Sequence, residues 1–223
     1  MSIVGYYGKN YIMNYIDDDV DCAVNKAIKN SRIWENRIIK LYEKIIDNTS
    51  VALDIGSHLG THTVPLSIRA KTVHAFEPQK RIFNLLTKTI DDNSIDNVIL
   101  HNKIVSDTTG DEISFVNTDT GRAGLWSYRP YLKGTCTVET TMTIDSLELE
   151  RCDFMKIDVE KAEWDVIRGA RQTIKKFKPI ILIETFKTQK NLNQLDCFCK
   201  TYNYQQMYIS CNNYLLTQST AGM

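Results

Sequence analysis

The sequence has no apolar run that approaches the roughly 20 residues needed to cross a bilayer as a helix. Its first residues, Met1 to Gly5, also lack the charged and apolar regions of a secretory signal peptide. Both absences argue against a membrane-spanning helix and against secretion. We therefore expect a soluble, intracellular protein of the cytoplasm.

An excess of one charge and paired cysteines are missing as well. The 27 basic residues balance the 27 acidic ones, and neither sign forms a long block, so the basic stripe typical of nucleic-acid-binding proteins is absent. None of the six cysteines belongs to a CxxC pair, which argues against a zinc site and a disulfide framework. We predict reduced thiols and no nucleic-acid partner.

The length of 223 residues suits one α/β domain with a short extension. Apolar residues from Trp34 to Ile45 recur at helical spacing, which predicts an amphipathic helix within residues 20–47. We assign residues 1–48 to an N-terminal helical extension and residues 49–223 to the main domain.

Strands and helices alternate through most of the main domain. The predicted strands cover residues 51–55, 72–76, 98–105, 154–158, 179–184, 206–209 and 214–217. The predicted helices cover residues 61–70, 79–91, 162–176 and 191–202. This alternation indicates an α/β fold with a mostly parallel sheet, helices on both faces and a ligand site at the carboxyl ends of the strands.

The alternation stops between about residues 108 and 145. Two β-rich pieces, 112–116 and 135–144, flank a segment rich in glycine, arginine and aromatic residues, which predicts a β-rich insertion with a loop or lid. Aromatic faces beside guanidinium donors suit a sugar or aromatic ring, although a lid that packs on the domain itself fits equally well. The candidate acceptor contacts are Arg122, Trp126, Tyr128, Arg129 and Tyr131.

A glycine loop, Asp54 to Gly60, follows the first strand of the domain. Gly56 and Gly60 let the backbone turn tightly and approach a ligand without Cβ interference. Their spacing is GxxxG rather than the GxGxxG of dinucleotide sites, and no lysine follows to make a P-loop. His58 within the loop and Thr61 just after it complete the candidate cofactor-binding segment.

The next strand ends in Glu77, close to the position where an acidic residue hydrogen-bonds ribose in adenine-nucleotide sites. S-adenosylmethionine (SAM) is an adenosyl ligand without a pyrophosphate, and it needs one carboxylate near the glycine turn and another on its ribose. Asp54 and Glu77 supply that pair. Ser106 and Asp107, after the third strand, could contact its adenine, although an Asx turn explains them too.

Three carboxylates and a lysine follow the fourth strand, between Lys156 and Glu163. Carboxylates at a helix N-terminus are favoured by the helix dipole, so some of them need have no other role. Asp158 and Glu160 nevertheless lie beside the presumed methyl group, where a base takes a proton from a hydroxyl and Lys156 tunes the local charge. Asp158 is a candidate for both cofactor binding and catalysis, and Glu184, which ends the fifth strand, faces the same cleft.

Two histidines, His58 and His62, lie four residues apart beside the glycine loop and could suggest a metal site. Histidines on a loop or helix surface are commoner. We predict no metal.

In order and spacing, the motifs resemble the FkbM family of SAM-dependent methyltransferases. The glycine loop, Glu77-Pro78 and the stretch Lys156 to Glu163 carry the resemblance, which covers about residues 50–185. It implies a Rossmann-like class I methyltransferase fold with a seven-stranded, mostly parallel sheet and one antiparallel strand near an edge. It also implies that SAM is bound by Asp54, Gly56, Gly60 and Glu77.

The same resemblance places Asp158 and Glu160 near the reaction centre and supports Asp145 and Glu184 as family residues. Glu35 is the counterpart of a glutamate that often precedes the domain. Two residues depart from the family pattern. Lys161 stands where glycine is usual, and His58 stands where a small or amide residue is usual.

We therefore predict a SAM-dependent O-methyltransferase that moves a methyl group to a hydroxyl and releases S-adenosylhomocysteine (SAH). A sugar or glycan is the favoured acceptor, and a non-sugar small molecule is the alternative. A non-catalytic SAM- or glycan-binding module with this fold is a further alternative. An NAD-linked oxidoreductase is disfavoured, because GxGxxG and a Tyr-xxx-Lys pair are missing.

Overall fold

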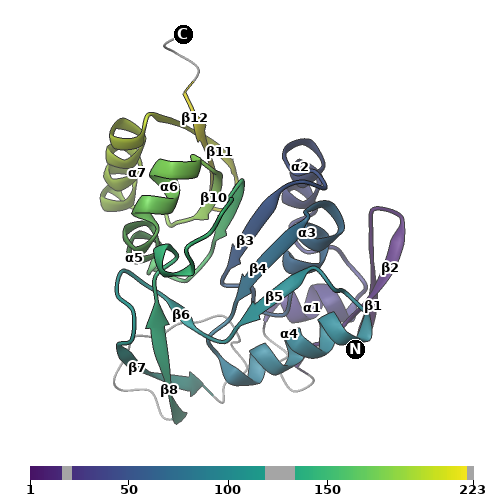
Figure 1. Cartoon of the computed structure of the whole chain (residues 1–223). Helices are drawn as coiled ribbons and strands as arrows, with labels where there is room; N and C mark the ends of the chain where they lie inside the picture. The colour runs from purple at the N-terminus through teal and green to yellow at the C-terminus, as the bar shows by residue number, and fades with distance from the viewer. Residues whose placement is uncertain (17–21, 119–133, 220–223) are drawn as a thin grey trace.

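A seven-stranded sheet forms the centre of the computed structural model, which describes residues 1–16, 22–118 and 134–219 (Figure 1). In spatial order its strands are β11 (Tyr204–Ser210), β12 (Asn213–Gln218), β10 (Ile180–Glu184), β9 (Phe154–Ile157), β3 (Val51–Ile55), β4 (Thr72–Phe76) and β5 (Val98–His101). Neighbouring strands from β10 to β5 are parallel, whereas β12 is antiparallel to both of its neighbours. The predicted fold is confirmed.

Alternate residues of the central strands face two different layers, as the period of a strand requires. Ala52 and Phe154 belong to a core shared with α2 (Asn36–Ile45), α3 (Thr63–Arg69) and α4 (Lys80–Asp92). Leu53 and Met155 belong to a second core, shared with α5 (Glu163–Gly169), α6 (Arg171–Phe177) and α7 (Gln189–Tyr202). Burial on both faces explains why these strands are apolar in sequence.

The sequence predicted a helical extension for residues 1–48, but the structure shows that these residues are only partly helical. They begin with an antiparallel hairpin of β1 (Ser2–Tyr6) and β2 (Lys9–Met13), whose turn residues Tyr7 and Gly8 both have positive φ angles. The predicted helix is split into α1 (Ala23–Lys29) and α2, because the chain turns at Glu35 with a φ of 47°. The domain boundary at residue 49 stays a prediction.

Two predicted elements are divided. The strand expected at 98–105 becomes β5 and β6 (Ile104–Val105), since the Asn102 amide between them donates to the carbonyls of Glu77 and Pro78. The helix expected at 162–176 becomes α5 and α6. Gly169 lies at the break, and a Cβ there would be 2.0 Å from the Ser106 carbonyl oxygen.

The β-rich insertion forms a separate small sheet. Strand β8 (Gly134–Met142) pairs in antiparallel fashion with β7 (Glu112–Thr118) and in parallel with β6, and the 3-10 helix η1 (Asp145–Leu147) follows it. The candidate acceptor contacts between Arg122 and Tyr131 lie outside the described residues. Over the described ranges, no helix combines the length and the hydropathy required to span a membrane.

Candidate functional site

The glycine loop lies directly against the segment that follows β9. The backbone N–H groups of Gly56 and Ser57 both donate to the Phe76 carbonyl at the end of β4, which turns the loop over the sheet edge. Gly56 has a φ of +86°, and a Cβ on it would be 1.8 Å from the Asp158 carbonyl oxygen. Only glycine fits here. Because glycine has no side chain, the loop can lie directly against the backbone of Asp158.

The far end of the loop is constrained in the same way. Gly60 also has a φ of +86°, and a Cβ there would be 2.8 Å from a methyl group of Leu86 on α4. Thr61 is buried directly after it. The predicted cofactor residues of the loop are therefore ordered against both neighbouring strands and α4.

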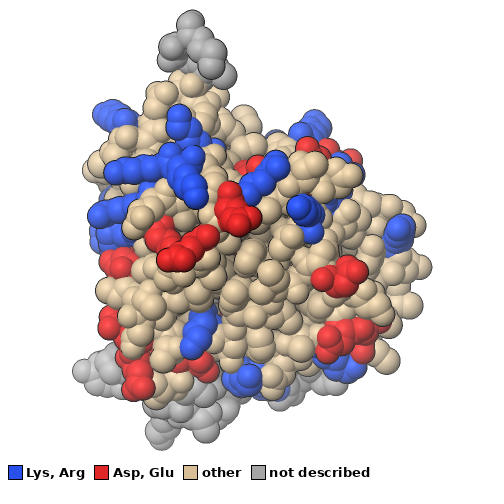
Figure 2. Space-filling model, viewed as in Figure 1, with Lys and Arg blue, Asp and Glu red and all other residues tan. Residues whose placement is uncertain are grey.

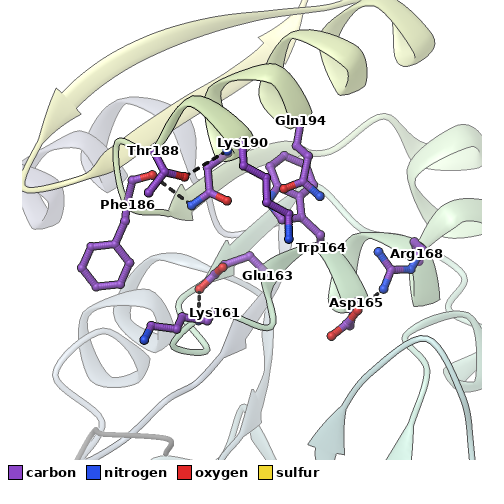
Figure 3. A pocket seen from close by; sticks show the side chains of 10 residues that line it. Lys161, Glu163, Trp164, Asp165, Arg168, Phe186, Thr188, Lys190 and Gln194 are labelled. Carbon is purple, nitrogen blue, oxygen red and sulfur yellow. Dashed lines mark hydrogen bonds and ion pairs between the residues drawn. The ribbon is translucent and has the colours of Figure 1, made fainter. Parts of the chain in front are cut away.

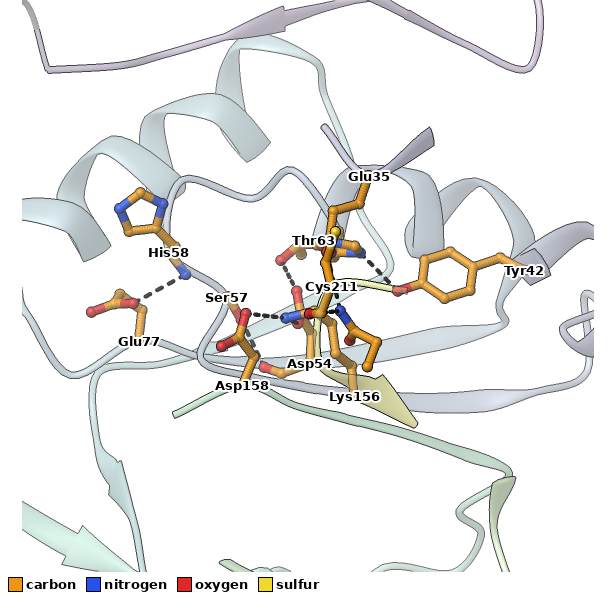
Figure 4. A network of polar contacts seen from close by, with 12 residues as sticks. Glu35, Tyr42, Asp54, Ser57, His58, Thr63, Glu77, Lys156, Asp158 and Cys211 are labelled. Carbon is orange, nitrogen blue, oxygen red and sulfur yellow. Dashed lines mark hydrogen bonds and ion pairs between the residues drawn. The ribbon is translucent and has the colours of Figure 1, made fainter. Parts of the chain in front are cut away.

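Glu77 is fixed by the loop backbone, as Figure 4 shows. One carboxylate oxygen accepts from the His58 backbone N–H at 3.0 Å, and the other accepts from the Gln79 N–H at 2.8 Å. The side chain is almost completely buried, and this burial, together with nearby Asp54 and Asp158, raises its pKa to about 7 despite the two donors. The backbone of His58, rather than its ring, therefore orients the predicted ribose-binding carboxylate.

Asp54 lies deeper than expected for a residue that contacts a ligand. It is fully buried, and its Oδ2 accepts from the Thr63 hydroxyl at 2.6 Å. Its Oδ1 lies 4.0 Å from Lys156 Nζ and has no hydrogen-bond partner among the described residues. In this arrangement Asp54 supports the loop and neutralises Lys156.

Lys156 lies between two carboxylates (Figure 4). Its Nζ donates to Asp158 Oδ2 at 3.0 Å, and Asp54 lies on the other side. Burial alone would lower the pKa of this amine, but the charges of Asp158, Asp54 and Glu35 outweigh it and raise the pKa. Lys156 is therefore charged, and it holds the Asp158 carboxylate in place.

Two further predicted residues, Glu160 and Glu184, share the electrostatic environment of Asp158. Burial and the Asp158 charge raise the pKa of Glu160 to about 7. The same two causes raise the pKa of Glu184, at the end of β10, to about 8. The structure thus brings the predicted catalytic carboxylates together at the adjacent ends of β9 and β10.

A buried hydrogen-bond chain beneath the site was largely missed by sequence reasoning. His62 Nδ1 lies 2.8 Å from the Tyr42 hydroxyl, and Nε2 lies 3.0 Å from Glu35 Oε2. Burial raises the pKa of Tyr42, so its hydroxyl stays protonated beside Nδ1, and the Glu35 carboxylate accepts from Nε2–H. The Asn213 amide donates to the other oxygen of Glu35 at 3.1 Å.

The two histidines beside the glycine loop lie against different residues. The His62 ring contacts Tyr42 and Glu35. His58 lies within the loop, and its backbone N–H donates to Glu77 (Figure 4). In the parts of the chain that the structure describes, no group of three or more His, Cys, Asp or Glu residues could hold a metal ion. Of the residues in the hydrogen-bond chain around His62, the resemblance to the FkbM family had singled out only Glu35 in the sequence.

Ser106 and Asp107 follow the short strand β6 rather than a strand of the main sheet. The Ser106 N–H donates to the Met142 carbonyl, and Asp107 Oδ2 accepts from Arg168 Nε at 2.9 Å. This bond lowers the pKa of Asp107. Their predicted contact with adenine stays a prediction.

Asp145 has a structural role. Its carboxylate accepts the backbone N–H groups of Gln172 and Thr173 at 2.9 and 2.8 Å, which satisfies donors in the first turn of α6.

A pocket of 680 Å³ opens between α5 and the start of α7, and its lining begins in the segments that directly follow Glu160 and Glu184 (Figure 3). Lys161 and Glu163 enter it from the segment after Glu160, and Phe186 enters it two residues after Glu184. Sequence reasoning did not find this pocket, because its two walls are about 25 residues apart in the chain and only the parallel pairing of β9 with β10 brings them together.

A curated methyltransferase and several solved methyltransferase structures are similar to this chain. The hexuronic acid methyltransferase AglP of Haloferax volcanii is 28% identical over 151 residues, which cover 66% of this chain and 61% of that protein. The methyltransferase FkbM structure from Methylobacillus flagellatus has a TM-score of 0.57 at 16% identity, with 80% of this chain and 50% of that one covered. SMU.1697c of Streptococcus mutans, solved with SAH, has a TM-score of 0.52 at 15% identity, with 81% and 94% covered.

The chain thus spans about three fifths of its sequence relative and half of the FkbM structure. At these low identities the two structures establish the fold alone. Residues 54–206, from Asp54 to the strand β11, match the methyltransferase FkbM domain. The expected family, with SAM as its cofactor, is therefore confirmed, and this chain belongs to the FkbM methyltransferases.

Proposed function

We propose that this protein is a SAM-dependent O-methyltransferase that methylates a hydroxyl group of a sugar or glycan. The observation that carries the proposal is the contact between the two halves of the site. The glycine loop touches the backbone of Asp158, so the cofactor segment directly adjoins the carboxylates of Asp158, Glu160 and Glu184.

The loop and Glu77 fit an adenosyl ligand. Gly56 and Gly60 let the loop pack closely against Asp158 and Leu86, and Glu77 is held by two backbone donors with lone pairs left for a ribose diol. SAM, when bound, would supply a methyl group on positively charged sulfur for transfer to an acceptor oxygen, and the electron pair of the broken carbon–sulfur bond would stay on sulfur. Asp54, buried behind the loop, would act on this ligand only through Lys156 and the loop backbone.

Glu160 is our choice for the general base. Its pKa of about 7 places half of the molecules in the ionised form at neutral pH, which suits a group that must accept a proton and release it again. Glu184, with a pKa of about 8, is mostly protonated there and can donate a hydrogen bond to the acceptor. Asp158 is bound by Lys156, so we assign it to positioning beside the methyl group.

Two observations support a sugar as the acceptor. The sequence relative from Haloferax volcanii acts on a hexuronic acid, and the insertion of this chain carries the Trp, Tyr and Arg residues suited to a sugar ring. Solved structures of this fold do not define an acceptor, because one fold serves many substrates.

A two-step experiment tests the proposal. Calorimetry with SAM comes first, and an assay for methyl transfer to a panel of free and glycosidic sugars follows, with product identified by mass spectrometry and NMR. A methyl ether on a sugar hydroxyl supports the proposal. Transfer only to non-sugar hydroxyls, or SAM binding without transfer to any acceptor, would replace it with one of the two alternatives.

A further inference from the structure

The pocket between α5 and α7 has cationic, aromatic and unsatisfied polar groups in its wall. Figure 3 shows Phe186 and Lys161 on one side of it and Lys190 beside Trp164 on the other. Trp164 Nε1 and Gln194 Oε1 are buried and have no hydrogen-bond partner within the described residues. Such groups are satisfied when a ligand hydroxyl reaches them.

Some charged side chains of the pocket already have a protein partner, and others are free to contact a ligand. Arg168 is occupied, because it pairs with both Asp107 and Asp165. Glu163 is nearly buried and accepts from the Lys161 backbone N–H at 2.7 Å. Lys161 and Lys190 are exposed and form no ion pair with any described residue. Over this part of the molecule, which holds α6 and α7, Lys and Arg side chains also gather on the surface (Figure 2).

Lys161 occupies a strained position. Its φ is 85°, directly after Glu160 with a φ of 51°, and a side chain disfavours this region of backbone conformation. Glycine would adopt the same backbone without strain. A long cationic side chain placed here, at the edge of the carboxylate cluster and inside the pocket, indicates that the strain is offset by a function of the ammonium group.

We propose that this pocket binds the acceptor and that Lys161 pairs with a carboxylate on it, which makes the substrate class an acidic sugar of the hexuronic type. Phe186 and Trp164 supply apolar faces for the sugar ring. Lys190, on the opposite wall, attracts the same carboxylate of the acceptor. The inference rests on the proposed function, since it assigns the acceptor side of the same site.

The test measures binding to the full-length protein saturated with SAH. The probes are the methyl glycosides of glucuronic and galacturonic acid and their neutral partners, the methyl glycosides of glucose and galactose. We expect the acidic probes to bind more tightly, and Lys161→Gly to weaken them about fivefold while leaving the neutral probes unchanged. Because the substitution relieves strain, the variant should also unfold at a higher urea concentration than the wild type.

Two further variants complete the test. Lys161→Met removes the charge and keeps the backbone strain, so it should match Lys161→Gly in binding without gaining stability. Lys187→Met removes a neighbouring charge whose amine lies over the Tyr208 ring, at 3.6 Å from its centre and outside the pocket. It should leave binding unchanged and lower stability only slightly, through the loss of this contact with the ring.

The outcomes separate the two proposals. Equal binding of acidic and neutral sugars, or an equal loss with both Lys161 variants and Lys187→Met, would overturn the carboxylate contact and leave the sugar acceptor standing. If none of the four probes is bound or methylated while SAM still binds, the sugar acceptor itself fails, and this inference with it.

Discussion

The protonation state of Glu160 decides whether a base is available for the reaction. With its pKa near 7, Glu160 is protonated below that pH and ionised above it. We expect kcat to rise with pH through about 7 and to fall again above about 8, where Glu184 ionises and can no longer donate to the acceptor. Glu160→Gln should lower kcat about 10²–10⁴-fold and remove the rise, whereas SAM binding by calorimetry should be retained. If the pH profile of Glu160→Gln were unchanged, another residue would have to be the base, and Glu184 would be the next candidate.

Glu77 links SAM affinity and stability to pH with opposite signs. A ribose diol donates to the ionised carboxylate, so the affinity for SAM should increase as pH rises from 6 to 8. Without ligand, the raised pKa means that the contribution of Glu77 to stability is full below its unfolded value of 4.5 and is lost as pH rises through about 7. That contribution is about 3 kcal/mol, from 1.36 kcal/mol for each pKa unit.

The measurement for Glu77 is a pair of pH series, calorimetry with SAM and urea unfolding without it. Glu77→Gln cannot ionise, so it should bind SAM weakly at every pH and show a smaller loss of stability between pH 5 and 8. Parallel stability curves for the variant and the wild type would contradict the burial of this carboxyl.

At the scale of elements, His62 joins parts of the chain that the sheet does not connect. Through Tyr42 and Glu35 it ties α3 to α2, and through Glu35 it reaches Asn213 at the start of β12. His62→Ala removes two buried hydrogen bonds and leaves both partners unsatisfied, so it should lower the free energy of unfolding by about 2–4 kcal/mol. The shift of the urea midpoint measures this.

The matched control is His74→Ala. His74 is only half-buried, and its ring stacks on His101 at the edge of the sheet. It has no part in the hydrogen bonds that join His62 to Tyr42 and Glu35. This variant should lose about 1 kcal/mol. Equal losses for the two histidines would contradict the linking role of His62.

For the whole molecule, the question is whether the main domain folds without its first 48 residues. Nine of those residues lie in the core shared with α3 and α4: Val4, Tyr6, Met13, Ile16, Ile28, Ile38, Ile39, Tyr42 and Ile46. At about 1.5 kcal/mol or more each, their burial is as large as the whole 5–15 kcal/mol by which proteins are typically stable. A protein that begins at residue 49 should therefore aggregate or unfold without cooperativity.

Circular dichroism and light scattering on the truncated protein test this expectation. A shorter deletion of residues 1–2 is the control, since Met1 is exposed and Ser2 is only half-buried at the edge of the hairpin. A cooperative, monomeric protein from residue 49 onward would show that the main domain folds without the extension.

Several features were determined by the sequence alone, because they depend on residues close together in the chain. The apolar runs of β3, β4, β9 and β10 predicted the parallel sheet, since strands covered on both faces need continuous apolar segments. The glycine loop and Glu77 predicted the adenosyl site through their order and spacing. The cluster around Asp158 was visible as a run of charged residues after a strand.

Other features were decided by the tertiary structure, because they depend on residues distant in sequence. Asp54 proved to be buried against Lys156 only when β3 and β9 were paired in register. The hydrogen bonds of His62 to Tyr42 and Glu35, and the pocket between α5 and α7, have no local pattern. The order of the residues predicted the glycine loop and the carboxylates, and the pairing of β9 with β10 decided that Asp158 and Glu184 lie at neighbouring strand ends, where their charges interact.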